Sequence, residues 1–83
     1  MPEFKDVHDG MHGIRTPDAL HEAHEADLAI QAEEGVDFKR ALADPVSGKV
    51  FCLSEAPSAD AVKRIHERAG HPTDQVFAVP VTA

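Results

Sequence analysis

Four short segments of the chain carry β-branched or aromatic residues between turn-forming clusters, and this pattern predicts β-strands. The segments are residues 4–8, 36–43, 49–54 and 75–81. Pro80 falls in the last of them, and proline cannot donate a hydrogen bond to a neighbouring strand. We therefore expect the fourth strand to lie at an edge of the sheet.

Two longer segments begin and end with residues that suit helix termini. Thr16 and Ser58 are expected N-caps, because their hydroxyl groups can accept hydrogen bonds from the first helical turn. Gly35 and Gly70 are expected to end the two helices, since glycine readily adopts the left-handed conformation found there. The resulting order is βαββαβ, the ferredoxin-like α+β pattern of an antiparallel sheet with two helices on one face.

The length of 83 residues suits a single ferredoxin-like domain spanning 1–83. Four Phe and no Trp or Tyr limit the core that the domain can build. Phe51 and Leu53 should lie on the sheet face away from the helices, and self-association would cover them. We therefore expect a homodimer.

The charge balance restricts the possible partners. Lys and Arg total 8 against 15 Asp and Glu, which gives a formal net charge of -7. Such a surface disfavours nucleic acid and favours cations. No apolar run approaches the ~20 residues that span a bilayer, and the start of the chain does not look like a signal peptide. We expect a cytoplasmic protein with no nucleic-acid or membrane partner.

The first helix carries an unexpected polar pair. At ~100° per residue, Leu20, Ala23 and Ile30 mark a broad apolar face. His24 and Asp27 fall inside this face, three residues apart and able to touch. Packing alone would favour Leu or Ala at both positions. We therefore interpret the pair as part of a candidate metal or acid–base site.

Strand alternation predicts that further ligand-type residues meet this pair. Asp6 and His8 share one face of the first strand, and Cys52 lies on the face opposite Phe51 and Leu53. If these residues face the helices, six donor residues come together as a candidate metal or acid–base site. The six are Asp6, His8, His24, Asp27, Cys52 and His66.

Most of these positions also have a structural interpretation. A histidine that touches a core is often hydrogen-bonded without further function, and a free cysteine is a common small core residue. His71 is interpreted as a polar residue that terminates the second helix, although it could complete a surface site. No metal, phosphate-loop, nucleotide or nucleophile motif is present, so no catalytic residue is assigned.

Several short motifs resemble a known family. They are Asp6-Val7-His8, the segments 23–27 and 51–58, and 65–68 followed by Gly70-His71. In these motifs the chain resembles the small actinobacterial nickel-binding proteins of ferredoxin-like fold, part of a larger family of uncharacterised domains. The resemblance implies a homodimer that binds nickel, and it covers all six candidate residues without assigning their roles.

The leading hypothesis is therefore a protein that sequesters or buffers Ni(II) as part of metal homeostasis. Imidazole and thiolate ligands would also accept Zn(II) or Cu(II), and intrinsic affinity favours copper over nickel. One alternative is a cofactor-free enzyme of the dimeric α+β barrel type that uses His24 and Asp27 as an acid–base pair. Another is a dimer that binds a small ligand. We favour a binding protein over an enzyme.

Overall fold

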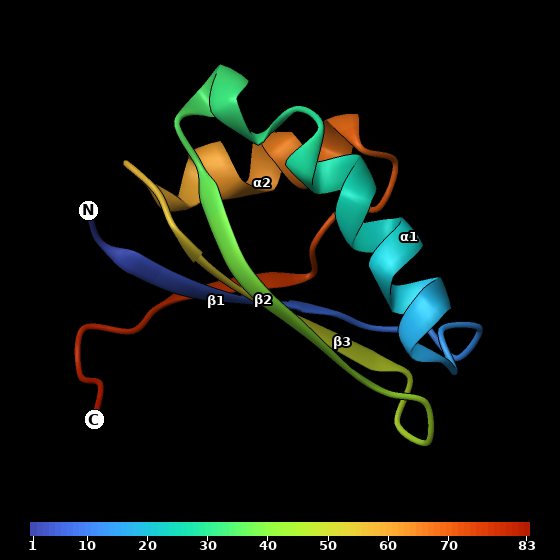
Figure 1. Cartoon of the computed structure of the whole chain (residues 1–83). Helices are drawn as coiled ribbons and strands as arrows, with labels where there is room; N and C mark the ends of the chain where they lie inside the picture. Colours follow the sequence, from blue (N-terminus) through green and yellow to red (C-terminus); the bar gives the residue numbers. More distant parts are fainter.

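The computed structural model describes residues 1–83, and its elements follow the predicted order (Figure 1). They are β1 (Glu3–His8), α1 (Pro17–Leu28), the 3-10 helix η1 (Gln31–Glu34), β2 (Asp37–Asp44), β3 (Lys49–Glu55), α2 (Ala59–Arg68) and β4 (Gln75–Ala78). Both α-helices lie on the same side of the sheet. The ferredoxin-like α+β fold is thus confirmed.

The sheet is antiparallel, with strand order β2-β3-β1-β4. β1 lies between β3 and β4, and its register sets Asp6 opposite Cys52 and His8 opposite Val50. β4 is an edge strand, as Pro80 predicted, but it ends at Ala78 and leaves Pro80 outside the sheet. The register brings ligand-type residues of two strands side by side.

The predicted caps begin both helices. The Thr16 hydroxyl accepts a hydrogen bond from the Ala19 N–H at 3.1 Å, and Ser58 accepts one from the Ala61 N–H at 3.2 Å. These bonds satisfy N–H groups that have no partner within the first helical turn. The start of each helix is therefore set by local sequence.

The end of the first helix was predicted wrongly. α1 stops at Leu28 instead of continuing to Gly35, and the left-handed Gly35 ends η1 instead. Ile30 leaves the helical conformation and packs against the core, while the Gln31 side chain accepts a hydrogen bond from the Phe38 N–H at 2.9 Å. Contacts with the sheet therefore end α1, without a proline or glycine at that point.

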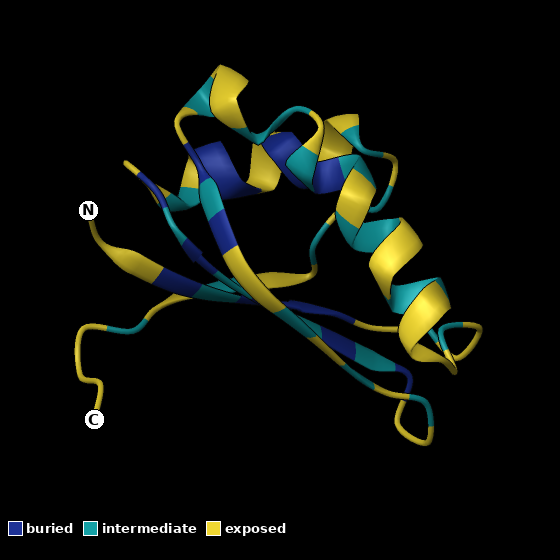
Figure 2. Cartoon of the chain, in the orientation of Figure 1, coloured by how far each residue is buried: buried dark blue, intermediate teal, exposed yellow.

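The apolar core lies between the inner face of the sheet and α2, as the buried segments in Figure 2 show. Its eight buried residues are Phe4, Val36, Phe38, Cys52, Ala56, Ala61, Val62 and Ile65. Beside it are buried polar residues, which is unusual because polar groups cost free energy to desolvate. None of the helices has the length and apolar character needed to cross a membrane.

Candidate metal centre

Three predicted site residues meet on the inner face of the central strands. Asp6 and His8 alternate along β1 and are buried, and Cys52 of β3 is the register partner of Asp6. α2 places the fully buried His66 over them. One ligand atom from each of these four residues lies within 4.8 Å of the others, and we call Asp6, His8, Cys52 and His66 the inner cluster.

His66 lies between two carboxylates. Its Nε2 is 2.9 Å from Asp6 Oδ2, and its Nδ1 is 2.9 Å from Asp27 Oδ1. Carboxylates only accept hydrogen bonds, so both ring nitrogens donate and the ring is an imidazolium. Burial opposes this charge, but the hydrogen bonds to Asp27 and Asp6 outweigh it and raise the pKa of His66 to about 11.

The two carboxylates respond in the opposite direction. Burial favours their neutral forms, yet the hydrogen bond from His66 and the close approach of a second histidine lower the pKa of each. For Asp6 the second histidine is His8, and for Asp27 it is His71. Both carboxylates are therefore ionised at neutral pH, with the neighbouring histidines compensating their charge.

His8 is held with one nitrogen aimed into the inner cluster. Its Nδ1 donates a hydrogen bond to the Pro72 carbonyl at 3.1 Å, which directs Nε2 toward Asp6. A backbone carbonyl on the far nitrogen is a common way to orient a metal-binding imidazole. Burial disfavours a charged ring here, but the Asp6 carboxylate raises the pKa of His8 to about 9.

Two buried atoms of the inner cluster lack a hydrogen-bond partner, namely Asp6 Oδ1 and His8 Nε2. They lie 3.0 Å apart without the alignment of a hydrogen bond. An unpaired buried polar atom costs about 1–3 kcal/mol. A transition-metal ion would use both atoms, and the surrounding nitrogen, oxygen and sulfur donors suit such an ion. The residues present therefore fit a bound metal.

A second group of donors lies on the other side of His66. His71 Nε2 is 3.0 Å from both Asp27 oxygens, and the side chain of His71 is 17% exposed. Ligand atoms of Asp27, His66 and His71 lie within 4.8 Å of one another, and we call these residues the outer cluster. The two clusters share only His66.

The interpretation of His71 as a terminating residue missed this contact. The Gly70 N–H donates to the Glu67 carbonyl, and the His71 N–H donates to the His66 carbonyl at 3.0 Å. With Gly70 at a φ of 91°, these two bonds form a Schellman motif, which brings His71 back toward His66. The predicted helix end at Gly70 was therefore the local signal from which the position of His71 near His66 could have been predicted.

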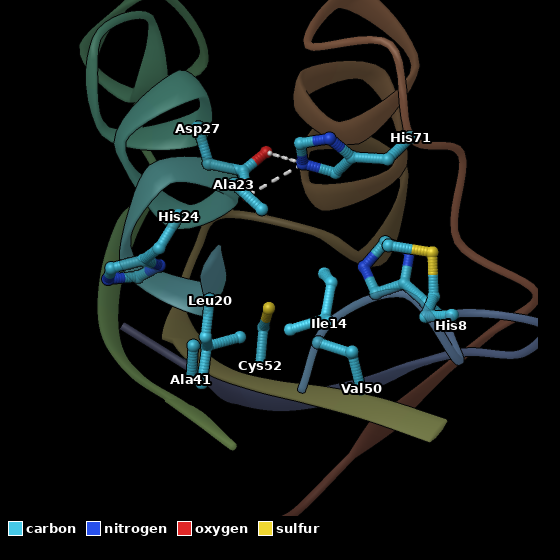
Figure 3. A pocket seen from close by; sticks show the side chains of 11 residues that line it. His8, Ile14, Leu20, Ala23, His24, Asp27, Ala41, Val50, Cys52 and His71 are labelled. Carbon is cyan, nitrogen blue, oxygen red and sulfur yellow. Dashed lines mark hydrogen bonds and ion pairs between the residues drawn. The ribbon is translucent and has the colours of Figure 1, made fainter. Parts of the chain in front are cut away.

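His24 lies apart from both clusters. Its ring is half-buried beside Phe38, with ring centroids 6.3 Å apart, and its Nδ1 has no hydrogen-bond partner. His24 is one of the residues that line a cavity of about 10 Å³, together with His8, Asp27 and His71 (Figure 3). That volume suits about one water molecule. The structure thus brings five of the six predicted residues into the two clusters and leaves His24 at the cavity wall.

The remaining histidines lie outside this region. His21 pairs with Glu25 on the exposed side of α1, with 3.4 Å between Nε2 and Oε1, as a solvated face predicts. His12 lies in the loop after β1, and its ring packs over Gly48. Neither residue contributes to the two clusters.

The fold and the site together define a ferredoxin-like α+β domain with a buried set of transition-metal donors. Comparison with known proteins gives the family. Residues 4–79 match the family described as nickel responsive protein SCO4226-like, and the chain belongs to it. This membership confirms the resemblance inferred from the sequence.

A solved relative has nearly the same structure. It is SCO4226 from Streptomyces coelicolor A3(2), known from a crystal structure analysis, and it is 58% identical to this chain. The match covers 98% of this chain and 99% of the relative, with a TM-score of 0.92. A search among curated proteins found no match.

Proposed function

We propose that this protein binds Ni(II) in the cytoplasm and sequesters or buffers it. The observation that carries the proposal is the inner cluster, where His8 Nε2 and Asp6 Oδ1 are buried 3.0 Å apart without a hydrogen bond, beside Cys52 and His66. Buried polar atoms without a hydrogen bond call for an explanation, and a bound ion would engage both of these atoms. The family description, nickel responsive protein, favours nickel as the ion.

Asp6, His8, Cys52 and His66 are the proposed ligands. Asp27 would orient His66 through its hydrogen bond to Nδ1, as carboxylates do behind metal-binding imidazoles. His24 would act from the cavity wall, either as an additional ligand after a side-chain rearrangement or as a lining residue. Zn(II) and Cu(II) would bind the same donors, so selectivity for nickel would depend on metal availability as well as on affinity.

The enzyme hypothesis receives less support from these contacts. It needs His24 and Asp27 to work as an acid–base pair, but no hydrogen bond joins them. The Asp27 carboxylate is instead engaged by His66 and His71. The protonated His66 now holds the position of a cation between the two carboxylates, and it would give up its Nε2 proton when a metal ion binds.

Equilibrium dialysis against Ni(II) with near-ultraviolet absorption tests the proposal. We expect bound nickel at a fixed stoichiometry and a thiolate-to-nickel charge-transfer band. Cys52→Ser should abolish the band, and His8→Asn should weaken binding by more than the roughly 10–100-fold typical of outer-sphere residues. His21→Asn, which removes an exposed imidazole outside the site, is the matched control. Absence of bound nickel, or unchanged affinity in both site variants, would contradict the proposal.

A homodimer remains part of this proposal. The sheet face away from the helices carries Phe51, Leu53 and Phe77, and Phe77 is 47% exposed. An apolar face of this kind is often covered by a second copy in a small domain. Analytical ultracentrifugation at low micromolar concentration should give the mass of two chains, and a single-chain mass would refute this part.

A further inference from the structure

Cys52 is the only cysteine of the chain, and its sulfur points into the small cavity between α1 and the sheet (Figure 3). A buried cysteine that serves only packing behaves as a small apolar residue and needs no free space beside its sulfur. Here the cavity of about 10 Å³ suits one water molecule, and one oxygen atom bonded to Sγ would need about the same space. The cavity therefore leaves room for a single added oxygen at this sulfur.

A buried histidine nitrogen without a partner faces the same space. His8 lines the cavity, its side chain is 3% exposed, and its Nε2 makes no hydrogen bond. Because Nδ1 is held by the Pro72 carbonyl, the ring does not turn to pair Nε2 elsewhere. A second unpaired atom, Asp6 Oδ1, lies 3.0 Å from Nε2, and Asp6 is the register partner of Cys52. Two unpaired polar atoms thus lie beside the sulfur.

A hydroxyl group bonded to Cys52 Sγ would engage both atoms. Asp6 Oδ1 only accepts hydrogen bonds when ionised, whereas His8 Nε2 donates or accepts according to the protonation of the ring. A hydroxyl group has one donor and two acceptor positions, while an S–H group is only a weak donor. Ligand atoms of the three residues lie within 4.8 Å of one another, a separation that an intervening oxygen atom spans. The surroundings of the sulfur therefore suit an S–O–H group better than they suit the thiol.

We propose that Cys52 is a site of oxidative modification, at which a hydroperoxide such as hydrogen peroxide converts the thiol to a sulfenic acid held by His8 and Asp6. The sulfur attacks one peroxide oxygen, so that an S–O bond forms and the O–O bond breaks. The sulfur is oxidised, and the second peroxide oxygen leaves as water after taking the thiol proton. This inference does not depend on the proposed function. An ion in the inner cluster would engage the same atoms, so the metal-free chain is the form that reacts.

The packing of α1 allows a small oxidant to enter and restricts the product. Leu20, Ala23 and His24 form the α1 side of the cavity wall, and all three are only half-buried. Segments with few buried contacts open locally at a lower cost than global unfolding. Because the cavity holds about one oxygen atom, oxidation should stop at the sulfenic acid. The chain has no second cysteine, so an external thiol would have to restore Cys52.

Chemical trapping of the metal-free chain tests the modification. Hydrogen peroxide is added to the folded protein, which is then unfolded in the presence of a dicarbonyl reagent that reacts with sulfenic acids. Peptide mass spectrometry should find the reagent on Cys52 in the wild type and in the control His21→Asn. Met11 also lines the cavity, but its sulfoxide does not react with the reagent. An unlabelled Cys52, labelling only when peroxide is added to the unfolded chain, or sulfinic acid as the main product would each overturn the proposal.

The role of His8 is tested by the lifetime of the sulfenic acid. His8→Asn should shorten this lifetime by about 10-fold, the effect expected for the loss of one hydrogen bond. His24→Asn removes another imidazole from the cavity wall and is the matched control. Nitrogen-detected NMR of the wild type needs no variant, and the His8 Nε2 resonance should move on oxidation while the His21 resonances stay. An unmoved His8 resonance, or an unchanged lifetime in folded His8→Asn, would refute this role.

Discussion

The two α-helices cover the same face of the sheet but are held to it by different interactions. α2 buries four residues, of which Ala61, Val62 and Ile65 are apolar and His66 is charged. α1 buries one residue, and that residue is Asp27. The apolar face of α1, which looked broad in sequence, is thus half-buried, and the rest of the helix is exposed (Figure 2).

This difference indicates which interactions hold each helix to the rest of the domain. α2 is held by apolar burial, which is insensitive to pH and to metal. α1 is joined to α2 through the contacts of Asp27 with His66 and His71, which depend on the charge of these groups. We therefore expect the charge state of the site to affect the packing of α1 more than that of α2.

The largest stability effect should come from the apolar side of α2. Ile65 is fully buried in the core, so Ile65→Ala should lower the free energy of unfolding by about 2–5 kcal/mol. Leu20→Ala on the half-buried face of α1 is the matched control and should cost less. Urea denaturation of the metal-free proteins measures both. Equal losses would mean that the two helices are held alike.

Removal of the charge that anchors α1 should have a smaller but distinct effect. Asp27→Asn keeps an oxygen for His66 but removes its negative charge, so we expect a loss of about 1.5–3 kcal/mol, typical of hydrogen bonds to charged groups. Hydrogen exchange should also accelerate in α1 more than in α2. Glu25→Gln changes an exposed carboxylate on the same helix and should alter stability by less than about 1 kcal/mol. Uniform acceleration in both helices would contradict the proposed anchoring.

The stability of the metal-free protein should fall at alkaline pH. His66 has a pKa of about 11 in the folded chain against an ordinary value of 6.5, so folding strengthens its hold on the proton. Its contribution is fully present below pH 6.5 and is lost as the pH rises through about 11. Nickel affinity should rise over the same interval, because ligating imidazoles must give up their protons. Denaturation and dialysis at several pH values would detect these opposite trends, and parallel trends would refute the assignment.

The smallest effect is expected at His24. Its ring makes no hydrogen bond at Nδ1, so His24→Leu removes no such bond at that atom and should change stability by less than about 1 kcal/mol. Nickel affinity should fall less than in His8→Asn, since no ion pair ties His24 to either cluster. Dialysis of the two variants side by side measures the difference. A larger loss in His24→Leu would make His24 a principal ligand.

Local patterns in the sequence were enough to predict most of the fold and the placement of three of the four inner-cluster residues. Thr16 and Ser58 start helices because a hydroxyl group reaches only N–H groups close to it in the chain. Asp6 and His8 face the helices because strand side chains alternate, and Cys52 joins them because the two central strands pair. The helix starts and the strand faces depend on short-range geometry, which sequence spacing encodes directly, and the pairing of the two central strands follows from the fold class.

The partners of the buried charges were decided only by tertiary structure. His24 and Asp27 are near neighbours on α1, yet Asp27 binds His66 and His71 from a distant part of the chain. A carboxylate pairs with whichever donors the packed elements bring within about 3 Å, and spacing along one helix does not reveal those donors. The end of α1 was likewise decided by the contacts of Ile30 and Gln31 with the core and β2. The sequence alone thus determined which residues could hold a metal, and the packing of α2 against the sheet determined which of them meet.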